Sequence, residues 1–337
     1  MSKPFLTYQQ QIQKLKSQKH LIIADEEFAE QKLKEIGYFS LIGGYKTLFI
    51  DPMTRLYHGD TTFEDICALY DFDKDLRELT FRYLIEIEQK IRQLISYSFC
   101  SYFGEQQSFY LSPKSYNPSP KIAPDVSKLI QQLEHIANID VSKAYLIHYR
   151  RVYHNVPLWV ATKALTFGQL SKFYSFLIFG QQSAISIEYE HLTEKNLERY
   201  LSCLTIFRNA CAHNEKLFNL RLQQRDFPDT ILHKKLGIAQ KGVQYIQGKK
   251  DYFGLVIAFR YLLPRTVFCE FKRGLIRLIQ SYTKKSNRIS ENTLFQEMGM
   301  PLNWFNITFY LRNDVTWKKI GEQKKSGERN KLGGTAE

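Results

Sequence analysis

The stretch DKDLRELTFRYLIEIEQKIRQLISYSFCSYFG, residues 73–104, decides the fold class of this chain. Apolar side chains recur in it every three or four residues, at Leu76, Leu79, Tyr83, Ile87, Ile91, Leu94 and Phe99. This period places them along one face of an α-helix. Gly104 follows as a stop signal. The stretch therefore predicts one long amphipathic helix.

The same helical period dominates the segments on both sides of this stretch. It predicts helices over 7–20, 25–39, 61–70, 125–153, 156–180, 194–222 and 251–285, and a short one within 292–305. Asp25 is the expected N-cap of the second helix, Thr61 or Thr62 begins the third, and the helix over 194–222 follows Thr193. The helix over 156–180 begins near Pro157, is interrupted at Gly168 and is closed at Gly180, and Pro264 breaks or kinks the helix over 251–285. The remaining parts of 41–73 and 225–250 are predicted as turns and loops. No segment alternates convincingly like a strand, so the expected fold is all-α.

Composition and charge describe a globular, basic protein. The 337 residues are 44% hydrophobic, and the formal net charge is +13. Residues 318–337 hold six Lys or Arg and three Glu, which is +3, so about +10 belongs to the rest. A surplus of this kind favours polyanionic partners such as nucleic acid. Residues 311–337 have almost nothing to bury and are expected to form a disordered tail.

The cysteines and the start of the chain indicate a reduced, cytoplasmic protein. Five cysteines, an odd number without a CxxC pair, are expected to be buried thiols. Cys203, Cys211 and His213 lack a fourth ligand at a usual zinc spacing, so no metal site and no cofactor are expected. The first twenty residues lack the apolar core of a secretory signal. No uncharged apolar run is long enough to span a bilayer.

Common catalytic motifs for nucleotide binding, zinc hydrolysis and serine catalysis are missing from the sequence. Glu86 and Glu88 point to different faces of the long helix at their spacing, which indicates solvation and not an acid–base pair. The doublet Arg150–Arg151 lies between tyrosines, in YRRVYHN, a pattern found in nucleic-acid contacts. A solvated helix face explains the doublet at least as well.

The stretch FRNACAHNEKLFN, residues 207–219, carries the candidate site. Asn209 and His213 are i,i+4 neighbours on a helix, so the amide could orient the imidazole. Arg208 is rotated away, but its long side chain could reach an anion near His213. Spacing alone favours a simpler interpretation, in which His213 satisfies a helix end and Arg208 extends into solvent.

The wider context resembles a known family. YLSCLTIFRNACAHNEKLFN (200–219) resembles a segment of the Abi-like (AbiD/AbiF) family of bacterial phage-defence proteins, whose members typically have R-N-x-C-A-H before L-[WF]-N. Similar family segments correspond to residues 3–45, 72–92, 156–174 (VPLWVATKALTFGQLSKFY) and 298–305 (MGMPLNWF). Many relatives have a basic residue before L-[WF], and Lys216 keeps that charge here. The resemblance covers about residues 3–305 in consistent order.

The resemblance implies a HEPN-type ribonuclease. The HEPN signature is Arg-x(4–6)-His on the last helix of a small bundle, often with Asn after the Arg; Arg208, Asn209 and His213 match it. HEPN nucleases act as dimers with facing motifs, and this chain has one Arg-x4-His, so a symmetric homodimer is expected. The expected divisions are an N-terminal module (1–60), a HEPN-like core (61–225), a C-terminal extension (226–310) and the tail (311–337).

Histidine and arginine suit RNA cleavage. RNA carries its own nucleophile, the 2′-OH, histidine moves protons near neutral pH, and arginine stays charged beside phosphate. We therefore expect a metal-independent endoribonuclease for single-stranded or loop RNA, active in abortive infection or a toxin–antitoxin system. Arg208, Asn209 and His213 would be catalytic, and Lys216, Arg150 and Arg151 would bind RNA. A structured RNA or a protein antitoxin would restrain it. Two alternatives stay open: a non-catalytic RNA-binding module and a partner-binding HEPN domain inert toward RNA.

Overall fold

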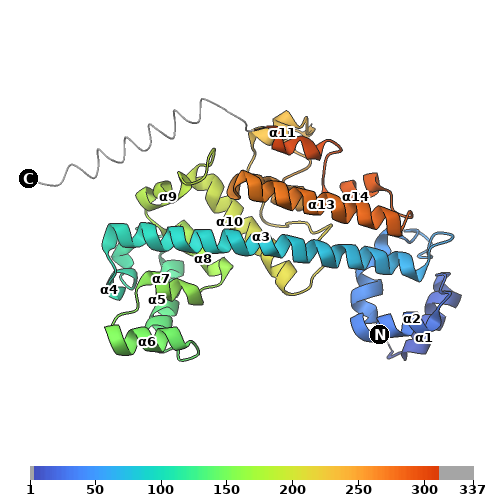
Figure 1. Cartoon of the computed structure of the whole chain (residues 1–337), viewed down its shortest axis with the longest axis horizontal. Helices are drawn as coiled ribbons and strands as arrows, with labels where there is room; N and C mark the ends of the chain where they lie inside the picture. Colours follow the sequence, from blue (N-terminus) through green and yellow to red (C-terminus); the bar gives the residue numbers. More distant parts are fainter. Residues whose placement is uncertain (1–3, 311–337) are drawn as a thin grey trace, which may run out of the picture.

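A computed structural model describes residues 4–310 of the chain. Nearly all of its regular structure is helical. Within these residues the only strands are two strands of two residues each, which form one hairpin, so the all-α prediction is confirmed. Helix α3 (Phe63–Phe103) runs the length of the molecule, and several of the other helices pack along it (Figure 1). No helix among residues 4–310 is long and apolar enough to cross a membrane.

Helix α3 is longer than expected. It has 41 residues, about 60 Å at 1.5 Å per residue. Thr62 begins it with a capping box to Asp65, and Gly104 ends it with φ +96°. The prediction of a separate helix over 61–70 was wrong, because the chain continues as a helix through Asp73. That carboxylate is buried but finds partners elsewhere in the fold, so its polarity does not break the helix.

The N-terminal segment packs against the start of α3, at the right of Figure 1. It contains α1 (Tyr8–Gln13), the π-helical turn η1 (Lys14–Gln18), α2 (Glu26–Ile36), η2 (Phe39–Gly43) and η3 (Lys46–Leu48). Asp25 accepts a hydrogen bond from the Phe28 amide at 2.9 Å, which confirms it as the N-cap of α2. A parallel bridge between Ile22 and Thr62 joins this segment to the beginning of α3.

The middle of the chain forms shorter helices around the far half of α3. They are α4 (Gln107–Tyr110), η4 (Pro113–Ser115), α5 (Ala123–Asn138), α6 (Ala144–Tyr153), α7 (Leu158–Ala161), η5 (Thr162–Ala164), α8 (Phe167–Phe176) and α9 (Phe179–Ser186). The predicted helix 125–153 is two helices, because the Asp140 side chain accepts from the Ser142 amide and forms a turn between them.

The predicted helix over 156–180 also ends early, but not at a glycine. The chain breaks before Thr166, which caps α8 through a capping box with Gln169. Gly168 lies inside α8, where a Cβ would approach the Thr205 methyl to 3.3 Å. Gly180 lies inside α9, where a Cβ would come within 2.7 Å of the Tyr102 hydroxyl. Both glycines therefore permit close helix packing, and the predictions that Gly168 interrupts the helix and that Gly180 closes it were wrong.

Helix α10 (Glu194–Ala212) begins after Thr193, as predicted, and the Thr193 side chain caps it by accepting from the Asn196 amide. It ends ten residues before the predicted end at 222. Asn214 has a left-handed backbone with φ +57°, and the segment after it turns back toward α3. The end of α10 therefore falls at His213.

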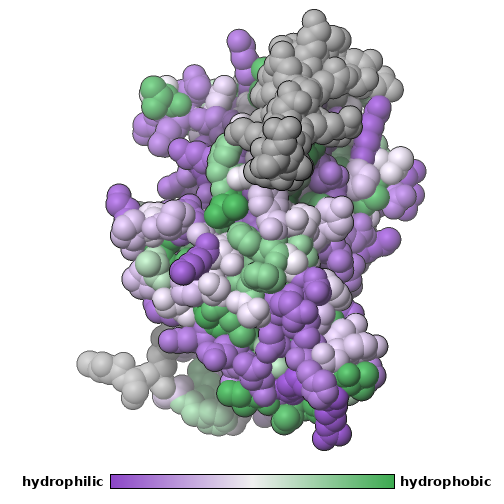
Figure 2. All heavy atoms as spheres, turned by 90° about the vertical axis from the view of Figure 1, so that its left-hand side faces the viewer, coloured by the Kyte–Doolittle hydropathy of each residue, from purple (hydrophilic) through white to green (hydrophobic). Residues whose placement is uncertain are grey.

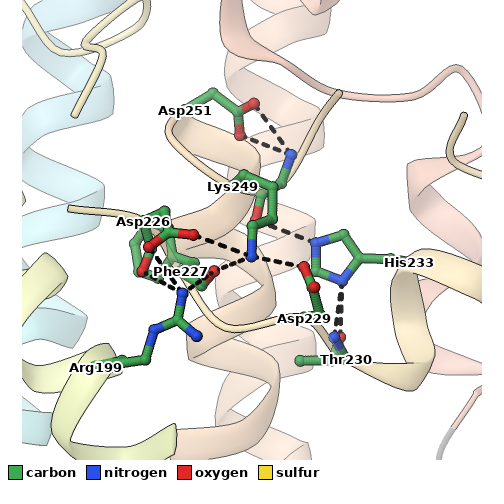
Figure 3. Close-up of polar contacts among 9 residues, drawn as sticks. Arg199, Asp226, Phe227, Asp229, Thr230, His233, Lys249 and Asp251 are labelled. Atoms are coloured by element: carbon green, nitrogen blue, oxygen red, sulfur yellow. Dashed lines mark hydrogen bonds and ion pairs between the residues drawn. The ribbon is translucent and has the colours of Figure 1, made fainter. Parts of the chain in front are cut away.

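The segment after α10 is held in place by polar contacts around the buried residues Lys249, His233 and Asp251, shown in Figure 3. It includes α11 (Ile231–Lys235) and the hairpin β1 (Gln240–Lys241) and β2 (Gln244–Tyr245), which is antiparallel with Gln240 opposite Tyr245. The buried ammonium of Lys249 contacts Asp229 at 2.6 Å and also the Phe227 carbonyl. Asp226 pairs with Arg199 of α10 at 2.8 Å. This network fixes the segment predicted as a loop against α10.

The C-terminal part returns along α3 on the side opposite α5 in Figure 1. It contains α12 (Tyr252–Leu262), α13 (Arg265–Lys285), α14 (Glu291–Met298) and η6 (Trp304–Thr308). Pro264 separates α12 from α13, as predicted. The predicted short helix and turn within 292–305 are also present. The tail predicted over 311–337 lies outside the described residues.

Candidate functional site

The Arg-x4-His motif occupies the last turn of α10. Phe207 and Ala210 of this turn are buried in the core, which directs the residues between them outward. His213 is the C-cap residue, and its amide donates to the Asn209 carbonyl at 2.9 Å. The motif therefore lies at a defined helix end, held from below by core side chains.

Arg208 extends toward the middle of α3. Its Nε atom lies 3.4 Å from a carboxylate oxygen of Glu88, and its guanidinium stands 5.8 Å above the Phe81 ring centroid. The other Glu88 oxygen accepts from Arg92 Nη2 at 2.6 Å. Glu88 thus lies between two guanidinium groups, one from α3 and one from α10. The side chain of Arg208 remains 26% exposed.

The outer edge of the Arg208 guanidinium is free to bind an anion. Glu88 approaches it through Nε, and the two terminal nitrogens make no hydrogen bond to any residue that the structure describes. Nε itself is buried and has an ion-pair distance to Glu88 without hydrogen-bond geometry. A guanidinium held by one edge with its fork unoccupied is suited to a phosphate group.

Asn209 and His213 are both exposed at the end of α10. Their side chains make no hydrogen bond to each other or to another group within residues 4–310. The expected orientation of the imidazole by the Asn209 amide is therefore not present in this structure. The His213 ring is accessible to a substrate from solvent.

A buried carboxylate fixes the chain just beyond His213. Asp73 of α3 accepts from the amides of Leu217 and Phe218, at 3.0 and 2.7 Å, and from the Tyr45 hydroxyl at 2.6 Å. It also pairs with Arg77 at 2.6 Å. Burial raises the pKa of Asp73, and these contacts act in the opposite direction. The contacts hold the turn after α10 against α3.

Lys216, a predicted RNA-binding residue, contacts the protein itself. Its ammonium donates to the Gly44 carbonyl at 3.0 Å, and burial lowers its pKa. The contact joins the end of the motif segment to the N-terminal segment. A role for Lys216 in binding RNA stays a prediction.

The predicted RNA-binding doublet lies on α6, away from the crossing of α3 and α10 in Figure 1. Arg150 donates to the Asp140 carbonyl, and its Nη1 atom is buried. Arg151 is exposed. Figure 2 shows this end of the molecule, with hydrophobic patches in green among hydrophilic groups; Val152 and Tyr153 of α6 are exposed hydrophobic residues. The structure does not bring the doublet together with Arg208.

The cysteines near the motif are free thiols with restricted reactivity. Burial raises the pKa of both Cys203 and Cys211 to about 12. These thiols are therefore protonated at neutral pH. Among the residues that the structure describes, no three His, Cys, Asp or Glu side chains gather where they could hold a metal ion.

Glu88 and Arg92 were not recognised from the sequence. The expectation that Glu88 is solvated was wrong, because it is buried and lies between Arg92 and Arg208. The i,i+4 spacing of Glu88 and Arg92 was the available signal. That spacing indicates a functional cluster only together with Arg208, which is 120 residues away from Glu88 in the sequence.

Comparison with known families decides the affiliation. The sequence model of a family described as Abi-like protein matches residues 31–219, more than half of the chain. The chain belongs to the Abi-like protein family. The matched range of this Abi-like protein contains all of α3 and α10, and so contains Glu88, Arg208 and His213.

Family membership suggests a role in abortive infection, a defence against phage. It confirms the resemblance to Abi-like proteins over residues 31–219. Searches among curated proteins and among solved structures found no match to this Abi-like protein.

Proposed function

We propose that this Abi-like protein is a HEPN-type endoribonuclease that cuts single-stranded or loop RNA. The observation that carries the proposal is the end of α10, where an exposed His213 follows an arginine with an unoccupied fork. The net charge of +13 supports a polyanionic substrate. Cleavage of RNA by this protein would act in abortive infection or in a toxin–antitoxin system.

The proposed reaction needs only the substrate and these side chains. The 2′-oxygen attacks the neighbouring phosphorus, and its proton passes to a neutral imidazole of His213. The bond between phosphorus and the 5′-oxygen breaks, and that oxygen takes a proton from an imidazolium. The products are a 2′,3′-cyclic phosphate and a 5′-OH end. No step requires a metal ion.

Arg208 would stabilise the charge that builds up on phosphorus oxygens during the attack. Its terminal nitrogens can bind two of these oxygens while Glu88 holds Nε. Glu88 is bound to Arg92, so the carboxylate is already partly neutralised and leaves Arg208 cationic toward substrate. Arg208 would thus act as a fixed electrostatic group, and His213 as the group that moves protons.

A single turnover needs one base and one acid, and the chain has one histidine in the motif. We propose that two copies face each other at the ends of their α10 helices, so that each site contains two imidazoles and two guanidinium groups. Such a symmetric dimer places the same surface on both subunits. A bound structured RNA or a protein antitoxin would keep the enzyme inactive in the uninfected cell.

The proposal is tested with purified protein and a labelled pool of single-stranded RNA in EDTA. We expect cleavage that leaves 2′,3′-cyclic phosphate and 5′-OH ends. A strand with a single 2′-deoxy sugar at a mapped cleavage site should resist cutting there, because the nucleophile is missing. Cleavage that requires added divalent metal, or that continues at the deoxy position, would overturn the mechanism. Absence of cutting after co-purified nucleic acid is removed would overturn the function.

A further inference from the structure

A basic groove lies beside α10. It is formed by α5, α8 and α10 and has a volume of about 350 Å³. Three cationic residues line it: Lys128 of α5, Lys172 of α8, and Arg225 from the segment after α10. Asp125 is the one acidic residue in its lining. The lining therefore carries a surplus of positive charge in a hollow of the surface.

The cations of this groove are largely available to a ligand. All three are exposed, and the ammonium of Lys172 has no ion-pair or hydrogen-bond partner within the described range. Lys128 lies 3.4 Å from Asp125 in an exposed pair, which contributes little to stability. Arg225 donates one nitrogen to the Ser202 carbonyl at 2.8 Å and keeps its other donors. Neutral donors in the lining, such as Gln132 and Ser171, suit sugar and phosphate oxygens.

The groove and the motif share one face of α10. Ser202 and Thr205 line the groove. Asn209 follows four residues after Thr205, and His213 follows four residues after Asn209, so all three lie on one side of the helix. At 1.5 Å per residue, Asn209 lies about 6 Å beyond Thr205 along the helix axis, and His213 about 12 Å beyond it. Asn209 and His213 are exposed, so this face of α10 stays accessible up to the motif.

The end of the groove nearest the motif is joined to the Arg208 cluster. Thr166, at the beginning of α8, lines the groove, and the carbonyl of the preceding Leu165 accepts from Arg92 at 3.4 Å. Arg92 binds Glu88, and Glu88 pairs with Arg208. Gly168 and Thr205 both line the groove, and the missing side chain of Gly168 allows α8 to approach Thr205 closely. The groove is thus positioned by the same helices that position the motif.

From this geometry we infer that the groove binds the backbone of the single-stranded RNA on one side of the phosphate to be cleaved. Lys128 and Lys172 neutralise phosphates, and the strand continues along α10 to His213. The contacts go to the backbone, so they add affinity for RNA of any sequence. The inference rests on the proposed ribonuclease function and adds the path by which the substrate reaches the site.

The test compares two matched double variants in an otherwise identical protein. Lys128→Gln/Lys172→Gln removes two charges from the groove. Lys284→Gln/Lys285→Gln removes two exposed charges from the end of α13, on the other side of α3 (Figure 1). Affinity for a labelled single-stranded RNA is measured across a series of salt concentrations in the His213→Ala background, so that the RNA stays intact. Cleavage is measured with the same pairs in the native background.

We expect the groove variant to bind RNA about tenfold more weakly and to lose about 1.4 from the slope of log affinity against log salt, at about 0.7 per phosphate contact on a single strand. Its cleavage should fall in parallel, while the α13 variant keeps the behaviour of its parent. If the wild type cuts RNA and both variants bind and cut alike, the groove inference fails and the function stands. If the wild type neither binds nor cuts RNA, both fail.

Discussion

Helix α3 carries two acid–base pairs with the same spacing and the same 2.6 Å contact, but they serve different purposes. Asp73 and Arg77 have side chains 0% and 4% exposed, whereas Glu88 and Arg92 are 11% and 15% exposed. The Asp73 carboxylate is surrounded by donors from Tyr45 and from the turn after α10. Glu88 instead contacts Arg208, which extends to the surface.

The difference teaches how a polar cluster in this protein can be assigned to folding or to function. Asp73 is buried and bound on all sides by the protein itself, which makes its contacts part of the fold. The cluster around Glu88 ends in Arg208, whose terminal nitrogens have no partner within residues 4–310. The same contrast separates two histidines: His233 is buried with both ring nitrogens bonded, and His213 is exposed with neither ring nitrogen bonded to a group in residues 4–310.

Removing the carboxylate of the buried Asp73–Arg77 pair should lower the stability of the protein more than any other change proposed here. Asp73→Ala leaves Arg77 as an uncompensated buried charge and removes the acceptor for the turn after α10, so we expect a loss of about 3–5 kcal/mol in the free energy of unfolding. Urea unfolding measures it. Asp75→Ala, an exposed carboxylate on the same helix, is the matched control and should change stability by less than about 0.5 kcal/mol. Equal effects from the two variants would contradict the structural role of Asp73.

Arg208→Lys tests the function of the other cluster. Lysine keeps the charge but loses the planar fork, so the rate of RNA cleavage should fall about 100-fold, with little change in unfolding free energy. Arg277→Lys, at an exposed position of α13, is the control and should cut at the rate of the wild type. Full activity in Arg208→Lys would show that the fork does not contact the reacting phosphate.

Glu88→Gln should have a smaller effect, because it acts through Arg208. The amide keeps a hydrogen bond to Arg92 but loses the charge that holds the Arg208 Nε. We expect kcat to fall about tenfold, roughly 1.4 kcal/mol in activation free energy, with KM changed less. An unchanged or increased kcat would mean that Glu88 does not position Arg208 for catalysis.

The smallest effect concerns the pH dependence of stability. Burial lowers the pKa of His233. Of the nearby charges, Lys249 lowers this pKa further and Asp229 raises it. The Nδ1 atom of His233 accepts a hydrogen bond from the Thr230 amide. The folded state therefore binds this proton less readily than the unfolded chain, whose histidine pKa is about 6.5. The stabilisation is complete above about pH 6.5 and is lost as the pH falls through the lowered pKa.

His233→Gln checks this prediction, because glutamine at this position can still accept from the Thr230 amide as in a capping box. Unfolding free energies of the variant and the wild type are compared between pH 7.5 and 5. The variant should show a flatter decline on acidification. Equal slopes would place the acid sensitivity on other groups.

Local signals in the sequence predicted much of this fold. The N-cap Asp25, the start at Thr62 (one of two predicted alternatives) and the helix start after Thr193 were correct, because capping depends on residues within one turn. The family resemblance also directed attention to Arg208 and His213, which lie in the last turn of α10 and at its C-cap. Whether they catalyse RNA cleavage stays a prediction.

Contacts between distant segments could not be predicted from one sequence. The continuity of α3 through Asp73 depends on partners more than 140 residues further along the chain. The sequence predicts a solvated Glu88, because its partner Arg208 belongs to another helix. The contact of Lys216 with Gly44 is of the same kind, because charge alone does not distinguish a surface lysine from one that binds a carbonyl.

The central claim is that His213 is the group that moves protons in RNA cleavage. The most direct test measures cleavage of single-stranded RNA in EDTA by His213→Ala and by His58→Ala, another exposed histidine, together with RNA affinity and unfolding free energy. We predict that His213→Ala cuts at least 100-fold more slowly, while its affinity and stability match the control. Undiminished cutting by His213→Ala, or binding of RNA without cutting by the wild type, would contradict the claim.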